Sequence, residues 1–254
     1  MSPDAVVGAA GARLRFASGK QVVDYGMDGG RILLGRAVAG IEAARAVRGE
    51  AVRDPFDGEA HLLACTLEAV QAVVDEMRRV RGGDLVVSDE GELFGRVDPA
   101  PGWDVRLVGP AAAAGMDFAA VLSRDPALLD GITRPAPPEP AAVAVAEVVV
   151  RLAGPLVVHQ LSGRSERLAF GIAEVAVGAG LDVEPHQPGG WFELRFAAAE
   201  VAAGVPERFR VEMLKRGFLV PEAGPWWPSL AHDYYMIEQT VDCAAAAMAA
   251  AAAI

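Results

Sequence analysis

Two kinds of periodicity predict the elements of the first half of the chain. Apolar and polar residues alternate over residues 14–25 on both sides of Ser18-Gly19, a pattern typical of a two-stranded hairpin. Apolar residues recur at helical spacing over residues 32–48 and 66–81, and glycine follows each stretch, so we expect two helices there. The first half therefore combines strands with helices.

A short apolar run in the same half leads directly into polar residues. The run Leu85–Val87 precedes Ser88, Asp89 and Glu90, which is the pattern of a buried parallel strand that delivers polar side chains at its carboxyl end. Ligands of open α/β sheets bind at such strand ends. Asp89 and Glu90 are therefore candidates for a functional site.

A proline-rich stretch divides the chain. Residues 133–140 read TRPAPPEP, and proline continues neither a helix nor an interior strand. We therefore expect one domain over residues 1–132 and a second over residues 133–254. In the second domain, periodicity predicts helices at 141–152, 164–179, 206–216 and 233–253 and strands at 191–196 and 218–220.

Composition and charge narrow the classes of function. Hydrophobic residues make up 52% of the 254 residues, which is enough for a packed core. The net charge of −11 argues against a nucleic-acid partner, because phosphate binding needs surfaces lined with lysine and arginine. Cys65 and Cys243 belong to no CxxC or Cys/His cluster, which fits a reducing compartment and indicates no metal site.

Neither end of the chain predicts an export signal or a membrane anchor. Residues 1–16 lack a basic region followed by a long apolar stretch. The apolar run 243–254 is about a dozen residues long, too short for a hydrocarbon core of roughly 30 Å. We therefore expect a cytoplasmic protein with no membrane partner.

Several stretches, taken in order, resemble the class III aminotransferases, most closely the glutamate-1-semialdehyde aminomutase group. The segment KQVVDYGMDGGRILLGRAVAGIEAA resembles the family's opening hairpin and glycine turn, with Arg36 where the family has histidine. ACTLEA at 64–69 stands at its phosphate-binding SGTEA turn, and GPAAAAGMDFAAVLSR at 109–124 is similar to its LGKxxGGG segment. PSLAHDYYMIEQTVDCAAAAM at 228–248 resembles its terminal SxAHTxEDIDxT pattern.

The resemblance places Pro110 where the family has the lysine that binds pyridoxal phosphate (PLP). Transamination needs a lysine amine, which proline lacks. Only Lys20 and Lys215 occur in the chain, in a hairpin turn and near the end of a helix. The resemblance thus implies an α/β, reduced PLP-dependent-transferase-like fold, with a truncated large domain and an α+β C-terminal small domain, and a protein that uses no cofactor.

The aspartate that pairs with the cofactor ring in the family has two alternative positions. In one register a deletion near residues 91–97 removes it. In the other, SDEGELFGR at 88–96 stands for the family's FDEVxTGFR, and Asp89 is that aspartate. Both registers leave Pro110 at the lysine position.

Four residues are candidates for catalysis. Asp89 and Glu90 can act as acid and base if a partly buried site splits their pKa values. Arg96 can bind a substrate carboxylate in bidentate fashion through two of its guanidinium nitrogens, and His232 can transfer protons. Each also has a structural interpretation. Asp89 and Glu90 can be solvated acids in a loop, and Arg96 can form an ordinary surface or interdomain ion pair. His232 can simply precede the last helix, at which Asp233 is the N-cap.

Other conspicuous residues carry weaker signals. His61, His159 and His186 are too scattered to indicate a metal site. Cys65 precedes a predicted helix, where a thiol pKa can fall, although a small core residue is the commoner role. Trp226 and Trp227 stand between two prolines, which predicts a rigid apolar loop that lines a pocket or a subunit interface.

Two hypotheses of function follow. The first is a PLP-independent enzyme, a homodimer that uses the emptied cleft for acid–base chemistry on a small-molecule substrate, such as cyclisation, isomerisation or elimination. The second is a non-catalytic protein, either a partner subunit of a full-length aminotransferase or a ligand carrier. The retained hydrophobic pattern favours the enzyme slightly, and the sequence does not specify its substrate.

Overall fold

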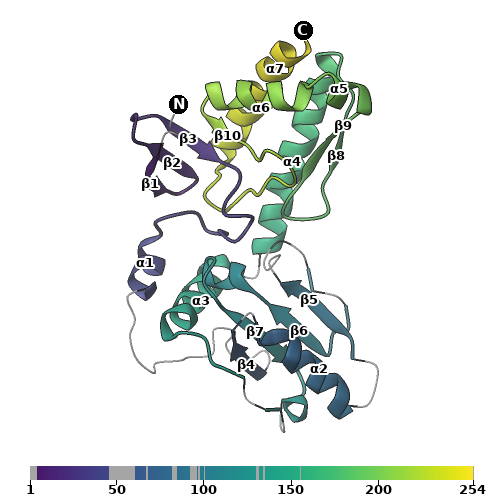
Figure 1. The fold of residues 1–254 in the computed structure, drawn as a ribbon. Coiled ribbons are helices and arrows are strands. Elements are labelled where there is room, and N and C mark those ends of the chain that lie inside the picture. The colour runs from purple at the N-terminus through teal and green to yellow at the C-terminus, as the bar shows by residue number, and fades with distance from the viewer. Residues whose placement is uncertain are drawn as a thin grey trace. The chain divides into compact units, whose positions relative to one another are not determined.

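The chain forms two compact units. The computed structural model describes residues 5–45, 61–66, 68–81, 85–91, 96, 98–99, 101–129, 132–133, 135–154 and 156–253. Unit 1 comprises Met1–Gly30, Leu34–Ala37 and Leu156–Ile254, and unit 2 comprises Arg31–Leu33 and Val38–Pro155. Figure 1 shows the order of the elements.

Unit 1 begins with a four-stranded sheet. Its order is β1 (Val6–Ala10), β2 (Arg13–Phe16), β3 (Gln21–Asp24) and β10 (Phe218–Leu219). The first three strands are antiparallel, and β10 joins β3 in parallel. Gly19 turns the chain between β2 and β3 at a φ of 86°, a conformation that favours glycine. The hairpin predicted at 14–25 is therefore confirmed, and β1 extends it by one strand.

Helices form the rest of unit 1, together with one small hairpin. The longest helices, α4 (Val157–Gly178) and α7 (Tyr234–Ala252), pack against each other. A side chain added at Gly171 of α4 would lie 3.0 Å from a methyl group of Val241, so a small residue lets the two helices approach. The remaining elements are α5 (Ala198–Ala202), α6 (Val205–Lys215), β8 (Val183–His186) and β9 (Glu193–Phe196).

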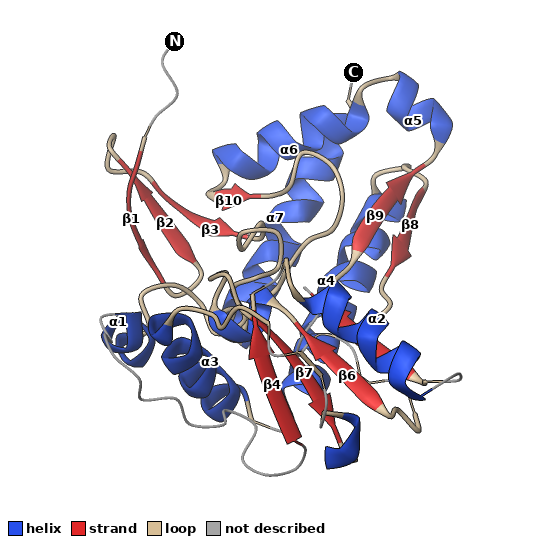
Figure 2. Cartoon of the chain, turned by 60° about the horizontal axis from the view of Figure 1, so that its bottom comes forward, coloured by secondary structure: helices blue, strands red, loops and turns tan. Residues whose placement is uncertain are grey.

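Unit 2 is built on a second four-stranded sheet. Its order is β4 (His61–Cys65), β7 (Ala119–Ser123), β6 (Val105–Val108) and β5 (Val87–Gly91). Strand β5 runs parallel to β6, and β7 is antiparallel to both β6 and β4. Figure 2 shows this sheet together with its helices.

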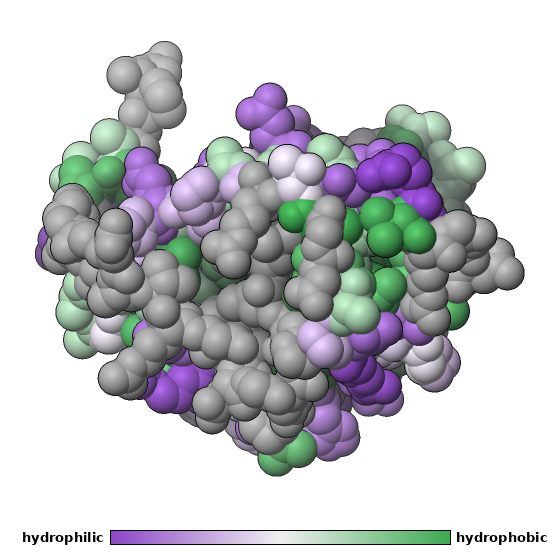
Figure 3. Space-filling view, turned by 90° about the horizontal axis from the view of Figure 1, so that it is seen from below, coloured by the Kyte–Doolittle hydropathy of each residue, from purple (hydrophilic) through white to green (hydrophobic). Residues whose placement is uncertain are grey.

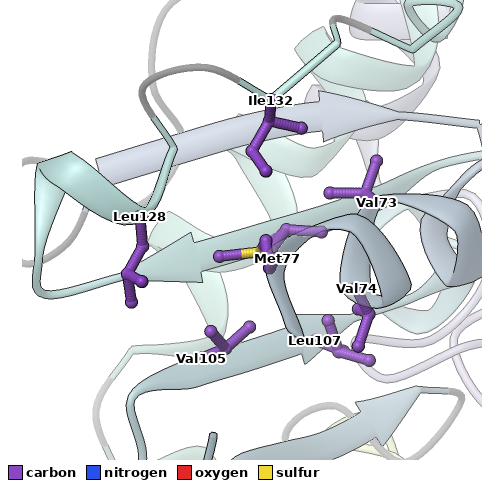
Figure 4. Close-up of a cluster of buried hydrophobic side chains, with 8 residues drawn as sticks. Val73, Val74, Met77, Val105, Leu107, Leu128 and Ile132 are labelled. Atoms are coloured by element: carbon purple, nitrogen blue, oxygen red, sulfur yellow. The ribbon is translucent and has the colours of Figure 1, made fainter. Parts of the chain in front are cut away.

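One face of the second sheet is covered by α2 (Val70–Arg81). Val73, Val74 and Met77 of α2 pack against Val105 and Leu107 of β6 (Figure 4). Burial of such side chains stabilises the unit by roughly 1.5–3 kcal/mol each. Elsewhere in unit 2, α3 (Pro140–Ala153) packs against α1 (Ala39–Arg45) and the short 3-10 helix η1 (Pro110–Ala113). A second 3-10 helix, η2, spans Pro126–Leu128.

Most helices lie where periodicity predicts them, but their bounds shift. The stretch predicted at 66–81 is helical from Val70, and the one at 164–179 already begins at Val157. The helix predicted over 32–48 is shorter: α1 spans only Ala39–Arg45, and residues 46–48 lie outside the described part. Ala37 just before it has a φ of 54°, which a helix does not accommodate.

The units divide the chain differently from the proline-rich boundary. The division falls at Pro155 rather than near Thr133, and residues 1–30 belong with the C-terminal half. The physical reason is packing, because Pro140 starts α3 at a position where proline is tolerated, and α3 then packs within unit 2. Among the described residues, no single helix is both long and apolar enough to cross a bilayer, although α3 and α4 satisfy that test when taken together.

Candidate functional site

Three strands of unit 2 end at the same edge of the sheet. Because β7 is antiparallel to β4 and β6, and β5 is parallel to β6, the carboxyl ends of β4, β5 and β6 lie together. The register aligns Cys65 with Ala119, Ala120 with Val108, and Val108 with Gly91. We call this end of the sheet, at Cys65, Val108 and Gly91, the strand-end edge. Ligands of open α/β sheets bind at edges of this kind.

Asp89 and Glu90 lie within β5, not after it. The strand predicted at Leu85–Val87 instead spans Val87–Gly91, because these residues pair with β6. The pairing is irregular between Asp89 and Gly91, where one residue of β5 has no partner in register. Asp89 pairs with Leu107 through its backbone, and its side chain lies outside the described part. Glu90 is buried, with 2% of its surface exposed.

Glu90 is held by an arginine from the neighbouring strand. Both of its carboxylate oxygens accept from Arg106, through Nε and through Nη2 at 2.8 Å. Arg106 stands between Val105 and Leu107, which face α2, so its side chain leaves the opposite face of the sheet. This bidentate geometry is the strongest form of a carboxylate–guanidinium ion pair. Both carboxylate oxygens of Glu90 are thus occupied by Arg106, which opposes a role in proton transfer.

Arg96 lies in a turn after β5 and is completely buried. Removal from water lowers the pKa of its guanidinium to about 9. It is therefore not the surface member of an ion pair, one of the two structural roles that the sequence allowed. Its role in binding a substrate carboxylate stays a prediction.

The chain turns directly after β6 through small apolar residues. Gly109 precedes η1, in which Pro110 and the three alanines that follow are all buried. Ala114 closes the turn at a φ of 49°, and its carbonyl accepts from Nη2 of Arg45 at 3.3 Å. The strand-end edge thus offers a packed turn after β6, with no amine in it.

Cys65, the last residue of β4, is a core residue. It is completely buried, and burial followed by the charge of Asp117 raises its pKa to about 11. The prediction of a lowered thiol pKa at a helix start was wrong, since Cys65 ends a strand and α2 begins only at Val70. The alternative interpretation, a small core residue, is confirmed.

His232 belongs to unit 1 and is completely buried there. Its Nδ1 accepts from the backbone N–H of Ser229 at 2.9 Å, and its Nε2 lies 3.1 Å from the carbonyl oxygen of Asp24. A backbone N–H only donates and a carbonyl only accepts, so the ring is neutral with its proton on Nε2. The next residue, Asp233, accepts from Met236 N at 2.8 Å, which confirms it as the N-cap of α7.

Tyr25 stacks on His232 and extends the same network. The ring centroids are 4.4 Å apart, and the Tyr25 hydroxyl lies 2.7 Å from Oγ1 of Thr240. Thr240 itself donates to the carbonyl of Met236, so it accepts from Tyr25. Burial raises the pKa of the Tyr25 phenol far above its usual value. No local sequence signal points to this pair, because 215 positions separate the two residues.

The two neighbouring tryptophans differ in their surroundings. Trp226 is 4% exposed, and its ring packs against those of Tyr25, Phe192 and Phe209. Trp226 is therefore a core residue, and the prediction of a pocket or interface loop was wrong for it. Trp227 packs over Gly30, where an added side chain would lie 2.5 Å from the indole.

The four predicted site residues are divided between the two units. Asp89, Glu90 and Arg96 belong to unit 2, and His232 belongs to unit 1. Both lysines also belong to unit 1. Nζ of Lys20 donates to the carbonyl of Leu214 at 2.7 Å, and Nζ of Lys215 lies 2.6 Å from Glu212.

Comparisons with known proteins identify the fold. No family model and no curated protein matches the chain. A structure of a transaminase with PLP bound matches with a TM-score of 0.74 at 14% identity, covering 100% of this chain and 92% of that one. The FumI protein of Sphingopyxis sp. MTA144, in its PLP internal aldimine form, matches with a TM-score of 0.72 at 15% identity over 96% and 88% of the two chains.

A third solved structure agrees. The N-acetylornithine aminotransferase from Stenotrophomonas maltophilia K279a matches with a TM-score of 0.71 at 16% identity, over 98% of this chain and 96% of that one. At such identities the likeness shows the fold alone. The chain therefore has the α/β, PLP-dependent-transferase-like fold that its sequence predicted.

Proposed function

We propose that this chain is a PLP-independent protein of the aminotransferase fold that acts as a non-catalytic partner subunit of a full-length aminotransferase. One observation carries the proposal: the side chains of Glu90 and His232, which could act as acids or bases, already bind structural partners. Glu90 is bound by Arg106, and both nitrogens of His232 lie within hydrogen-bond distance of backbone groups.

The residues of this chain do not fit a covalently held PLP. The cofactor would need a lysine amine that projects into an enclosed site. Lys20 is exposed and binds a carbonyl of α6, while the side chain of Lys215 is 65% exposed and pairs with Glu212. In the register proposed above, Pro110 stands at the lysine position and starts a buried turn.

A partner role fits the physics of oligomers. Aminotransferase-like subunits of the same fold offer self-complementary surfaces, and a copy with its own chemistry lost can still pair with an intact relative. Such a copy would keep a well-formed core, as both units of this chain do.

Native mass spectrometry of the protein purified from its host tests the proposal. A complex with a full-length aminotransferase, with any pyridoxal colour assigned to the larger subunit, is the expected result. A homodimer that carries a small metabolite and no second subunit would overturn the proposal.

The second candidate is the PLP-independent enzyme, and the strand-end edge favours it. Three strand ends converge there, and Asp89 lies beside them in β5. In this case Asp89 would be the acid–base group, and a small molecule would bind at the edge.

Matched substitutions in unit 2 separate the two candidates. If the chain is an enzyme, Asp89→Asn removes the host's product, whereas Asp75→Asn, the same change at an exposed position of α2, does not. If the chain is a partner subunit, Asp89→Asn leaves the product profile unchanged while the protein remains folded.

A further inference from the structure

Strand β1 forms an open edge of the first sheet. It pairs with β2 on one side only, and within unit 1 it is the outermost strand in both ribbon views (Figures 1 and 2). Among the described residues no strand pairs with its other side. Such an edge presents backbone N–H and C=O groups in a row, which is a template for another strand.

The sequence of β1 does little to protect that edge. The strand reads VVGAA, with no charge and no proline, the residues that usually block edge pairing. Val6 and Val7 are 52% and 54% exposed. Its one irregularity is a shift of register between Val6 and Gly8. In the space-filling view of Figure 3, apolar side chains lie among polar ones on the face seen from below.

The surface next to β1 is basic. Arg15 pairs with Gly8 and Arg13 with Ala10, so both arginines share one face of the sheet with these small residues. The Arg15 guanidinium lies across the strand, with Nη2 3.3 Å from where a Gly8 side chain would begin. Residues 5–23 contain Arg13, Arg15 and Lys20 and no acidic residue, in a chain whose net charge is −11. Both arginines are exposed.

The other face of the same strand is apolar. Val6 pairs with Phe16 and Ala9 with Leu14, which is buried. A strand added at the β1 edge would therefore meet a basic surface on one face and an apolar surface on the other.

We propose that β1 is a docking site for an extended segment of a partner protein, which adds as a further strand and carries an acidic residue opposite Gly8. The acidic side chain would pair with Arg15, while apolar residues at alternate positions would cover Val6 and Ala9. The inference goes beyond the proposed function and does not depend on it, because it concerns a strand of unit 1 that is remote in sequence from the strand-end edge.

A second copy of this chain fits the edge less well. Antiparallel pairing of two β1 strands around a two-fold axis at Gly8 would place both Arg15 guanidiniums on the same face near the axis. Like charges so close to each other repel. A foreign strand with a carboxylate at that position replaces this repulsion with an ion pair.

Binding of two synthetic peptides tests the docking site. The probes are acetyl-VTVEVTV-amide and acetyl-VTVKVTV-amide, which differ only in the sign of the central charge, and fluorescence anisotropy of labelled peptides measures affinity for the full chain. We expect the acidic peptide to bind about five-fold more tightly, which corresponds to about 1 kcal/mol for a partly exposed ion pair. Added salt should reduce the difference.

Charge reversal locates the site. In Arg15→Glu the preference should switch to the lysine peptide, whereas Arg151→Glu, which changes the net charge equally in unit 2, should keep the original preference. Denaturation curves verify that both variants are folded. Equal affinity for the two peptides, binding of neither, or a preference that Arg15→Glu leaves unchanged would overturn the proposal. Concentration-dependent dimerisation that Arg15→Glu removes would assign the edge to a second copy and would also overturn it.

Discussion

The two units enclose different sets of polar groups. In unit 1 the neutral side chains Tyr25, His232 and Thr240 form a buried network, next to the buried Asp24, which pairs with Arg36. Among the described residues of unit 2, the buried charged groups are Glu90, which pairs with Arg106, and Arg96. A buried charge costs more free energy than a buried neutral dipole unless it is well paired.

This difference indicates what each interior does. The neutral network joins the end of β3 to the start of α7. It therefore stabilises unit 1 by connecting segments that are far apart in the sequence. The charged pair of unit 2 holds β5 to β6 next to an edge of the kind that binds ligands in this class of fold. Substitutions in the two interiors should therefore affect separate units.

The largest expected effect comes from breaking the charged pair. Glu90→Ala leaves the partly buried Arg106 without its carboxylate, and we expect a loss of about 3 kcal/mol in the free energy of unfolding. The control Glu193→Ala removes an exposed ion pair in unit 1 and should cost less than about 1 kcal/mol. Urea denaturation measures both, and hydrogen exchange should locate the first loss in unit 2. Equal effects of the two substitutions would contradict the description of Glu90 as a structural anchor.

A comparable loss, confined to unit 1, is expected from His232→Ala. The variant loses the ring stack with Tyr25 and both hydrogen-bonding ring nitrogens, which together should cost about 2–3 kcal/mol. His159→Ala, at an exposed position on α4, is the control and should be neutral. Urea denaturation provides the measurement. If His232→Ala left stability intact and removed a product in the host, His232 would be catalytic and our structural interpretation would be wrong.

Tyr25→Phe should have a smaller effect. It keeps the ring and removes one buried hydrogen bond, at a cost of about 1 kcal/mol. In the unfolded chain the phenol ionises near pH 10, whereas in the folded chain its pKa is raised, so the native protein should lose stability as the pH rises above about 10. The part of this loss due to Tyr25 should be absent in Tyr25→Phe, and Tyr235→Phe, at an exposed position, should retain it. Denaturation midpoints between about pH 8 and pH 11 provide the test.

An effect of the same size as that of Tyr25→Phe is expected at the start of α7. Asp233→Ala removes the N-cap acceptor of Met236 N and should cost about 1 kcal/mol, whereas Asp233→Ser should restore most of that loss. Thermal unfolding of the three proteins compares them. If Asp233→Ala unfolded at the same temperature as the unsubstituted protein, the N-cap would add nothing to the stability that the network around His232 provides.

The sequence predicted the local features of the chain better than the long-range ones. Helical spacing found α2, α3, α6 and α7, and the Asp233 cap was visible from residue types alone. Strands β1, β4, β6 and β7 were not predicted, because they are short and lack regular alternation. Strand β8 was not predicted either, because it contains Pro185, a residue that argues against a strand. The Glu90–Arg106 and Tyr25–Thr240 pairs depend on strand register and on contacts between distant segments, which no local pattern encodes.

We propose that this fold works here without PLP, and a reduction experiment tests that proposal most directly. The protein is incubated with PLP, its visible absorbance is recorded, and borohydride then fixes any Schiff base for peptide mapping, with an intact transaminase as the positive control. We expect no aldimine band above that of the Lys20→Arg, Lys215→Arg double variant and no stoichiometric pyridoxyl group on either lysine. A stoichiometric, borohydride-sensitive band mapped to Lys20 or Lys215 would contradict the account.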